Sequence, residues 1–168
     1  MSTQETANTL YLEVDDTKYA YRVIGNASDD SPPLLMHNHV RSTIDTWDPF
    51  VINNLTATGR QLITAFALNL LAFLGVLLPT MNIHQVDVLG FSMGRYIAQQ
   101  VAFDAPDVVR KLVLAGTGPS FGPDLERPMN EVRSTVFNPT PGIPTIEAFF
   151  PSFTTGEQGL YSWHRWIM

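Results

Sequence analysis

The segment best suited to chemistry is residues 90–94, which read Gly-Phe-Ser-Met-Gly. A mostly apolar segment, Val-Asp-Val-Leu at residues 86–89, precedes it, and a helical pattern follows it. So tight a turn from strand to helix leaves no room for side chains at its flanks, which explains Gly90 and Gly94. The turn lifts Ser92 beside the free N–H groups of the helix's first turn, where a developing oxyanion is stabilised. Ser92 is therefore a candidate nucleophile toward an ester- or amide-type bond; the alternative is a purely structural turn.

Short strands must position this turn. The apolar and alternating runs predict strands at residues 11–14, 18–24, 34–36, 60–64, 86–89 and 111–115. The first two are close enough to form a hairpin through residues 15–17. The last is apolar enough to predict a buried strand.

Two amphipathic helices complete the pattern. The first is predicted over residues 46–59, with Asp48 and Pro49 at its start, Gly59 at its end and an apolar stripe of Trp47, Phe50, Val51 and Leu55. The second follows Ser92 and carries Met93, Ile97 and Val101 at four-residue spacing, with Ala98 and Ala102 beside them. Strands that alternate with helices predict a mostly parallel sheet with helices on its faces.

These features together resemble the N-terminal part of the α/β-hydrolase superfamily. The resemblance depends on residues 34–37 (LLMH) with Trp47 after them, on residues 90–94, and on residues 105–114 (APDVVRKLVL). It implies an α/β fold class, with a partial α/β-hydrolase core in residues 1–117 that begins with an antiparallel hairpin. Residues 118–168 follow, with seven prolines between positions 118 and 151. We interpret them as the start of an irregular lid.

The resemblance also implies an oxyanion hole. In this superfamily the loop after the third strand commonly begins His-Gly and supplies one backbone N–H. The matching residues here are His37 and Asn38, so the donor would be the backbone of His39 or of Val40. The second donor would be Met93, immediately after the nucleophile.

Arg95 departs from the family pattern, which usually has a small residue there. On a helical wheel Arg95 lies close to Ala98, at the border of the helix face that we expect to pack against the sheet. We expect a local distortion of the helix; the alternatives are a side chain that extends outward with its charge in water and a role in binding a phosphate or carboxylate.

Residues 61–86 contain no charged side chain and form a second departure. The predicted strand runs into a helix near Ala65 with no turn residue before Asn69, which indicates an internal deletion of a turn-rich segment. The competing interpretation is a membrane span at Leu62–Leu78, because about 17 apolar residues is the lower limit of length for a helix that crosses a bilayer. Membrane insertion is the less favoured of the two.

The third departure concerns the catalytic acid and base, which follow the serine in this superfamily. Asp124 and His164 are the only Asp and His between the last predicted strand and the chain end, and neither follows a strand. His37, His39 and His84 precede Ser92, in the wrong order. The acid and base are therefore unassigned, and weak or no activity is expected. The aromatic end at Met168 gives the impression of a truncated chain.

Composition excludes several classes of protein. A formal net charge of -6 with no basic cluster excludes a nucleic-acid partner, and the lack of cysteine excludes disulfides and thiolate metal sites. The polar first residues, MSTQETANTL, do not form a signal peptide, so a cytoplasmic protein is expected. No cofactor or metal is expected. An active form would take a small organic substrate; the alternative is a non-catalytic remnant or interaction module that self-associates through an exposed sheet edge.

Overall fold

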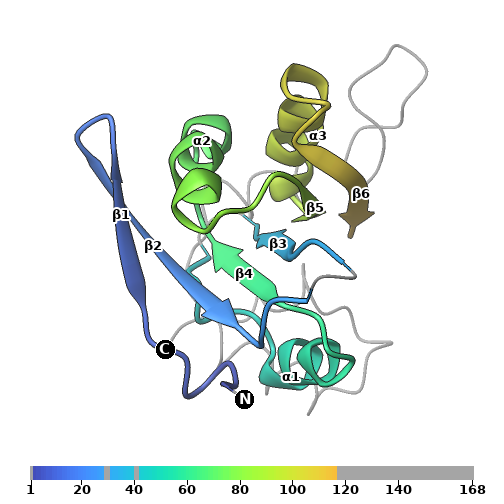
Figure 1. Cartoon of the computed structure of the whole chain (residues 1–168). Coiled ribbons are helices and arrows are strands. Elements are labelled where there is room, and N and C mark those ends of the chain that lie inside the picture. Colours follow the sequence, from blue (N-terminus) through green and yellow to red (C-terminus); the bar gives the residue numbers. More distant parts are fainter. Residues whose placement is uncertain (1, 29–30, 40–41, 117–168) are drawn as a thin grey trace, which may run out of the picture. The chain divides into compact units, whose positions relative to one another are not determined.

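The computed structural model describes residues 2–28, 31–39 and 42–116, within the first of two units of the chain, Met1–Gly118 (Figure 1). The predicted boundary at residue 117, Asp124 and His164 lie outside the described residues. The strands are β1 (Leu10–Val14), β2 (Thr17–Ile24), β3 (Leu34–His37), β4 (Leu62–Ala65), β5 (Val86–Phe91) and β6 (Val109–Ala115), and the helices are α1 (Pro49–Ala57), α2 (Leu70–Thr80) and α3 (Gly94–Asp104).

The six strands form one sheet in the order β1-β2-β4-β3-β5-β6. β3 runs parallel to both β4 and β5, and β5 runs parallel to β6. The β1–β2 hairpin is antiparallel and joins the sheet antiparallel to β4. Its turn places Asp15 and Asp16 at positive φ (48° and 60°), the backbone that the tightest hairpins require. The predicted mixed, mostly parallel sheet with an N-terminal hairpin is confirmed.

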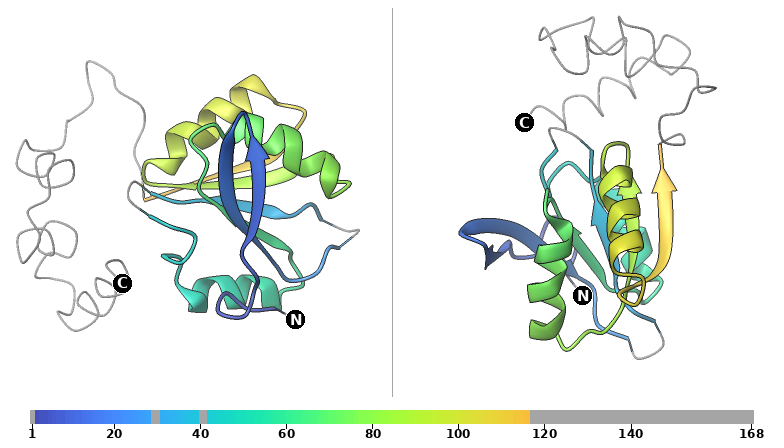
Figure 2. Two further views of the ribbon diagram at one scale, coloured as in Figure 1. Left: turned by 90° about the vertical axis from the view of Figure 1, so that its left-hand side faces the viewer. Right: turned by 90° about the horizontal axis from the view of Figure 1, so that it is seen from above.

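Helices cover both faces of the sheet. α2 and α3 lie on one face and α1 lies on the other (Figure 2). Successive residues of the central strands enter opposite cores: Leu35, Ile63 and Val88 pack toward α2 and α3, whereas Leu34, Met36 and Leu62 pack toward α1. Burial on both faces explains why β3 and β4 are mostly apolar rather than alternating between apolar and polar residues.

Helix α1 forms where the sequence predicts it, but turns a different face inward. Asp48 caps it by accepting a hydrogen bond from the Phe50 N–H (2.9 Å), and Gly59 stands just past its end at φ 84°. Phe50 is 74% exposed and Val51 43%, whereas Ile52 is fully buried. The predicted apolar stripe is therefore wrong at two of its members, because packing against the sheet selects the face that carries Ile52.

A four-residue connection, residues 66–69, joins β4 to α2. Asn69 caps α2, its side-chain oxygen accepting a hydrogen bond from the Ala72 N–H at 3.2 Å. The strand therefore does not run directly into the helix, and that expectation is wrong; the inferred loss of a longer turn segment stays a prediction.

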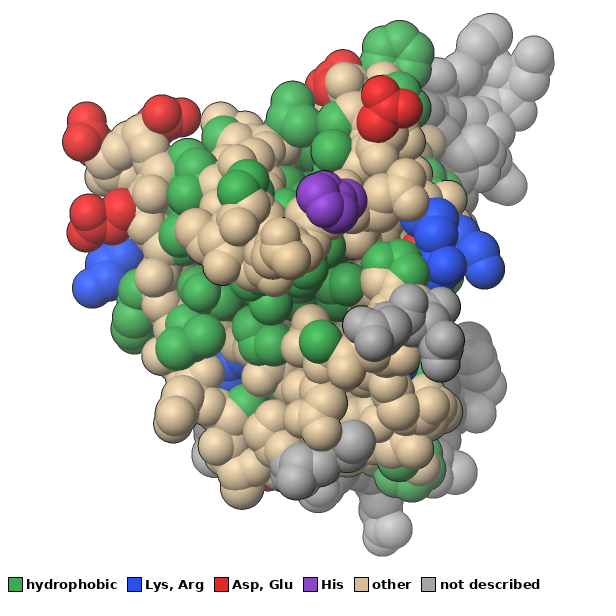
Figure 3. Space-filling model, viewed as in Figure 1, with side chains coloured by type: hydrophobic (Ala, Val, Ile, Leu, Met, Phe, Trp, Pro, Cys, Tyr) green, Lys and Arg blue, Asp and Glu red, His purple; other side chains and the backbone are tan. Residues whose placement is uncertain are grey.

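The membrane interpretation of Leu62–Leu78 is also wrong. This stretch is a strand within the sheet followed by an 11-residue helix, whose Phe73, Leu74 and Leu77 are buried in the core. No helix in the described part of the chain is long and apolar enough to cross a membrane. Helix α2 carries no charged side chain, and Figure 3 shows hydrophobic side chains across the middle of this view.

Strand β6 is more exposed than its sequence predicts. Leu112, Val113 and Leu114 are 37%, 46% and 41% exposed. The reason is that β6 is the last strand in the sheet order, with β5 alone beside it among the described residues. The prediction of a buried strand here is wrong.

An ion-pair cluster fastens the amino ends of the parallel strands. Asp87 in β5, whose side chain is 3% exposed, accepts hydrogen bonds from Arg110 Nε (2.9 Å) and Nη2 (2.8 Å), and it also pairs with Arg60. The hydrogen bonds from Arg110, which outweigh the cost of burial, and the neighbouring Arg60 lower the Asp87 pKa to about 2. The cluster lies at the opposite end of β5 from Ser92 and therefore serves stability.

Candidate active site

Ser92 stands at the turn from β5 into α3, in a strained backbone conformation. Its φ is 53°, a region that residues other than glycine rarely adopt. Its N–H donates to the Ala115 carbonyl (3.0 Å), and its own carbonyl accepts from the Arg95 N–H (3.2 Å). A strained serine held at the carboxyl end of a parallel strand is the geometry of a nucleophile turn.

Two glycines flank this turn, and neither has room for a side chain. A Cβ at Gly90 would lie 2.7 Å from the Gly94 carbonyl oxygen and 2.8 Å from the Ala98 Cβ. A Cβ at Gly94 would collide with the His37 carbonyl oxygen and lie 2.7 Å from that of Asn38. The two positions therefore hold α3 directly against β5 and against the chain that leaves β3.

The end of β3 lies beside the Ser92 turn. His37 is paired in register with Gly90, so the residues after it pass close to the start of α3. Met93 precedes the first residue of α3, and its N–H makes no hydrogen bond to any described residue. The sequence-predicted donors His39 and Met93 thus lie on adjoining segments, whereas Val40 lies outside the described residues.

The backbone N–H groups of His39 and Met93 differ in whether they already have a hydrogen-bond acceptor, which the sequence did not reveal. The His39 N–H donates to the side-chain oxygen of Asn38 at 2.8 Å. The Asn38 amide nitrogen donates in turn to Thr46 Oγ1 at 2.6 Å, and Asn38 is only 2% exposed. The sign of this hydrogen bond in the sequence is Asn38, which stands where the family pattern has Gly.

Aromatic side chains surround Phe91, the residue before the serine. The His39 ring meets Phe91 edge-on with 5.7 Å between ring centroids, and Trp47 lies 6.2 Å away at a tilt. The Trp47 indole N–H is buried and has no hydrogen-bond partner among the described residues. This grouping places aromatic side chains next to the serine turn.

His37 is a buried histidine whose ring hydrogen-bonds to the connection between β4 and α2. It is fully buried, and its Nε2 lies 2.9 Å from the Ala67 carbonyl oxygen. Burial lowers the pKa of His37, although the neighbouring backbone groups of Ala67 and Asn38 act in the opposite direction. The ring links the end of β3 to the connection between β4 and α2.

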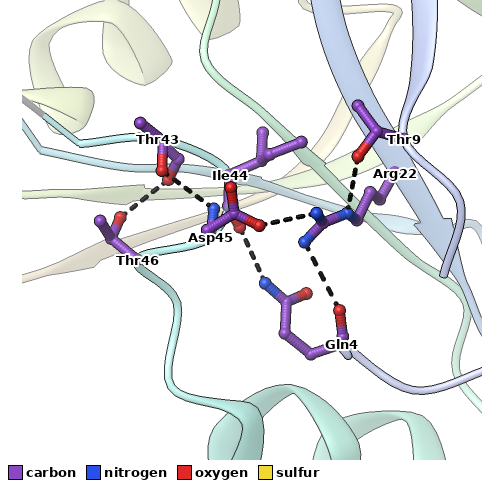
Figure 4. Close-up of polar contacts among 7 residues, drawn as sticks. All are labelled: Gln4, Thr9, Arg22, Thr43, Ile44, Asp45 and Thr46. Carbon is purple, nitrogen blue, oxygen red and sulfur yellow. Dashed lines mark hydrogen bonds and ion pairs between the residues drawn. The ribbon is translucent and has the colours of Figure 1, made fainter. Parts of the chain in front are cut away.

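A polar network fastens the chain that follows β3 (Figure 4). Arg22 of β2 pairs with Asp45 at 2.6 Å and donates to the Thr9 hydroxyl at 3.1 Å. The buried Gln4 side chain donates to the Ile44 carbonyl at 2.8 Å. The N-terminal segment and β2 therefore hold the segment that includes Thr46, the partner of Asn38.

Arg95 does not distort α3. The helix is regular from Gly94, and Ala98 is fully buried against the sheet. The guanidinium lies over the Tyr96 ring, 4.0 Å from its centroid, and hydrogen-bonds to its hydroxyl. The expected distortion is wrong because the side chain turns along its neighbour; anion binding by Arg95 stays a prediction.

The described residues supply no base for Ser92. Its hydroxyl makes no hydrogen bond within the described part of the chain. His84 is exposed and precedes β5, at the other end of the strand. The site as described therefore combines a strained serine with two candidate oxyanion donors, and the roles of Ser92, His39 and Met93 stay predictions.

This chain resembles several proteins of known structure. No model of a protein family matches the sequence, and no curated protein matches it either. Among solved structures, an α/β-hydrolase-fold protein from Chitinophaga pinensis is 27% identical with a TM-score of 0.66, covering 98% of this chain and 64% of its own length.

Two further structures are similar. A hydrolase from Pseudomonas aeruginosa is 26% identical with a TM-score of 0.59, covering 69% of this chain and 48% of its own length. An epoxide hydrolase from Vigna radiata is 12% identical with a TM-score of 0.61, covering 98% and 68%, and at that identity it is informative about the fold alone. The chain thus spans 64% and 48% of the first two proteins.

Proposed function

Because this chain has the α/β-hydrolase fold, we propose that it is a serine hydrolase that cleaves ester- or amide-type bonds in small organic molecules. Ser92 Oγ attacks the acyl carbon while its proton passes to water, and the backbone N–H groups of His39 and Met93 stabilise the oxyanion. Collapse of the oxyanion breaks the bond to the alcohol or amine, which leaves with a proton from water, and a water molecule then hydrolyses the acyl-enzyme to release the acid. The observation that carries the proposal is the positive φ of Ser92 between β5 and α3, with Gly90 and Gly94 packed too tightly to carry side chains.

The proposed rate is low. A serine hydroxyl is a poor nucleophile at neutral pH unless a base takes its proton, and no described residue hydrogen-bonds to the Ser92 hydroxyl. Such a site retains only the contribution of the oxyanion hole and of binding, which in dismantled serine proteases is still about 10³–10⁴ over water. Activated esters, which need the least help from a base, are the substrates to use.

Hydrolysis of p-nitrophenyl acetate by the purified full chain tests this proposal. We expect slow release of p-nitrophenol that Ser92→Ala abolishes, while Ser42→Ala, a serine of the loop after β3, retains it. Equal rates in the wild type and Ser92→Ala would refute the role of Ser92. Fast turnover that depends on Ser92 would refute the low rate and would require a base outside the described residues.

A second candidate function is a non-catalytic interaction module. The observation that favours it is the outer edge of β6, where Leu112, Val113 and Leu114 are partly exposed and no described strand pairs. An unpaired apolar edge promotes association between chains. Size-exclusion chromatography with dye binding distinguishes the candidates: a monomer that binds little hydrophobic dye counts against the interaction module.

A further inference from the structure

We propose that Asn38 is an internal competitor for the oxyanion site, whose side-chain oxygen occupies the His39 N–H until a substrate displaces it. The inference rests on the proposed function, because it concerns one of the two expected donors. Asn38 is then a positioning residue: in the absence of substrate it leaves the Met93 N–H as the one oxyanion donor that is available.

The position of Asn38 makes this competition direct. Its carbonyl oxygen would lie 2.7 Å from a Cβ at Gly94, so its backbone is fixed against the start of α3. An oxyanion donor must lie about 2.7–3.1 Å from the anionic oxygen. The Asn38 Oδ1 already lies 2.8 Å from the His39 nitrogen. An N–H directed at one acceptor at this distance is not available to a second one.

The surroundings hold Asn38 in the competing position. Its amide nitrogen donates to Thr46 Oγ1, whose hydroxyl donates to the Thr43 carbonyl at 2.8 Å. The Arg22–Asp45 ion pair fastens the same segment. With 2% exposure, Asn38 cannot exchange these partners freely for water. Freeing the His39 N–H therefore requires the Asn38 side chain to turn and to leave a buried acceptor without its donor.

The loss of a buried partner sets the size of the effect. Leaving a buried acceptor unsatisfied corresponds to a factor of about 10 to 100 in an equilibrium constant. The substitution Asn38→Ala removes the competing oxygen, so it is expected to raise kcat for p-nitrophenyl acetate by about that factor with little change in KM. A purely structural role predicts the opposite, a loss of stability and activity together.

The test combines this kinetic measurement with NMR of the His39 amide proton in the full-length chain. We expect Asn38→Ala to accelerate exchange of this proton with solvent as well as raise kcat. Asn38→Asp keeps an acceptor oxygen, so its kcat stays at or below the wild-type value. Ser42→Ala, which removes the hydrogen bond from Ser42 Oγ to the His39 carbonyl (2.6 Å), is the matched control and raises neither quantity.

The outcomes separate this inference from the proposed function. An unchanged or lower kcat in folded Asn38→Ala, or a wild-type His39 proton that exchanges as fast as in the variant, overturns the inference. Faster exchange in Asn38→Ala without any Ser92-dependent hydrolysis supports the Asn38 hydrogen bond and counts against the hydrolase. If Asn38→Ala does not fold, Thr46→Val frees the Asn38 amide and is expected to raise kcat by a smaller factor.

Discussion

Replacing Asp87 by Asn removes the charge that Arg60 and Arg110 share at the amino end of β5. The folded protein holds the pKa of Asp87 at about 2, against an ordinary value of 3.8. This difference corresponds to about 2 kcal/mol of stability at neutral pH. Asn keeps the size of the side chain but leaves two guanidinium groups facing a neutral partner. We therefore expect Asp87→Asn to lower the free energy of unfolding by about 2–3 kcal/mol at pH 7.

The lowered pKa of Asp87 also determines how the stability of the protein changes with pH. Because the folded-state pKa of Asp87 lies below the unfolded-state value, its stabilising effect is complete only above about pH 5 and is lost as the pH falls toward 2. The wild type is therefore expected to lose stability over this range more steeply than Asp87→Asn, and the two unfolding curves approach each other at low pH.

Urea unfolding followed by tryptophan fluorescence, at pH values from 7 down to 2, measures both effects. Asp107→Asn is the matched control, because Asp107 is an exposed aspartate of the chain entering β6 and its loss is expected to change stability by less than about 0.5 kcal/mol. Equal stabilities of the wild type and Asp87→Asn at pH 7, or parallel pH curves, would refute the assigned role of the cluster.

Three further experiments, with five substitutions in all, test other parts of the structure. Gly94→Ala is expected to destabilise the domain by about 2–4 kcal/mol in urea unfolding, whereas Gly75→Ala, with open space around it in α2, stabilises by about 0.5–1 kcal/mol; equal effects would contradict the packing at α3. Arg22→Ala is expected to cost about 1–2 kcal/mol in the same measurement and Asp45→Ala, 67% exposed on its side chain, less than about 1; the reverse order would contradict the network. Val113→Lys is expected to reduce dye binding and any self-association seen by size-exclusion chromatography, and an unchanged profile would exclude the β6 edge as the associating surface.

The sequence predicted the order of elements and the Ser92 turn because these depend on local signals. Glycine spacing, short apolar runs and the cap at Asp48 act within a few residues, so the β5–α3 turn and the start of α1 could be read directly. The hairpin turn at Asp15 and Asp16 was equally local.

The errors arose where neighbours in space decide the outcome. Phe50 fits the apolar stripe of α1 but faces outward, since the sheet packs on Ile52 instead. Val113 is apolar enough for a central strand, yet β6 lies at the edge of the described sheet. The hydrogen bond between Asn38 and the His39 N–H depends on a side-chain rotamer, which no spacing pattern specifies.

We propose that Ser92 is the nucleophile of a slow hydrolase, and the most direct test is to find which residue a fluorophosphonate probe modifies. After prolonged incubation of the full chain, peptide mass spectrometry is expected to place the phosphonyl adduct on Ser92 alone, with slow formation and none in Ser92→Ala. An unmodified Ser92, or an adduct distributed over other serines at a similar rate, would contradict the account.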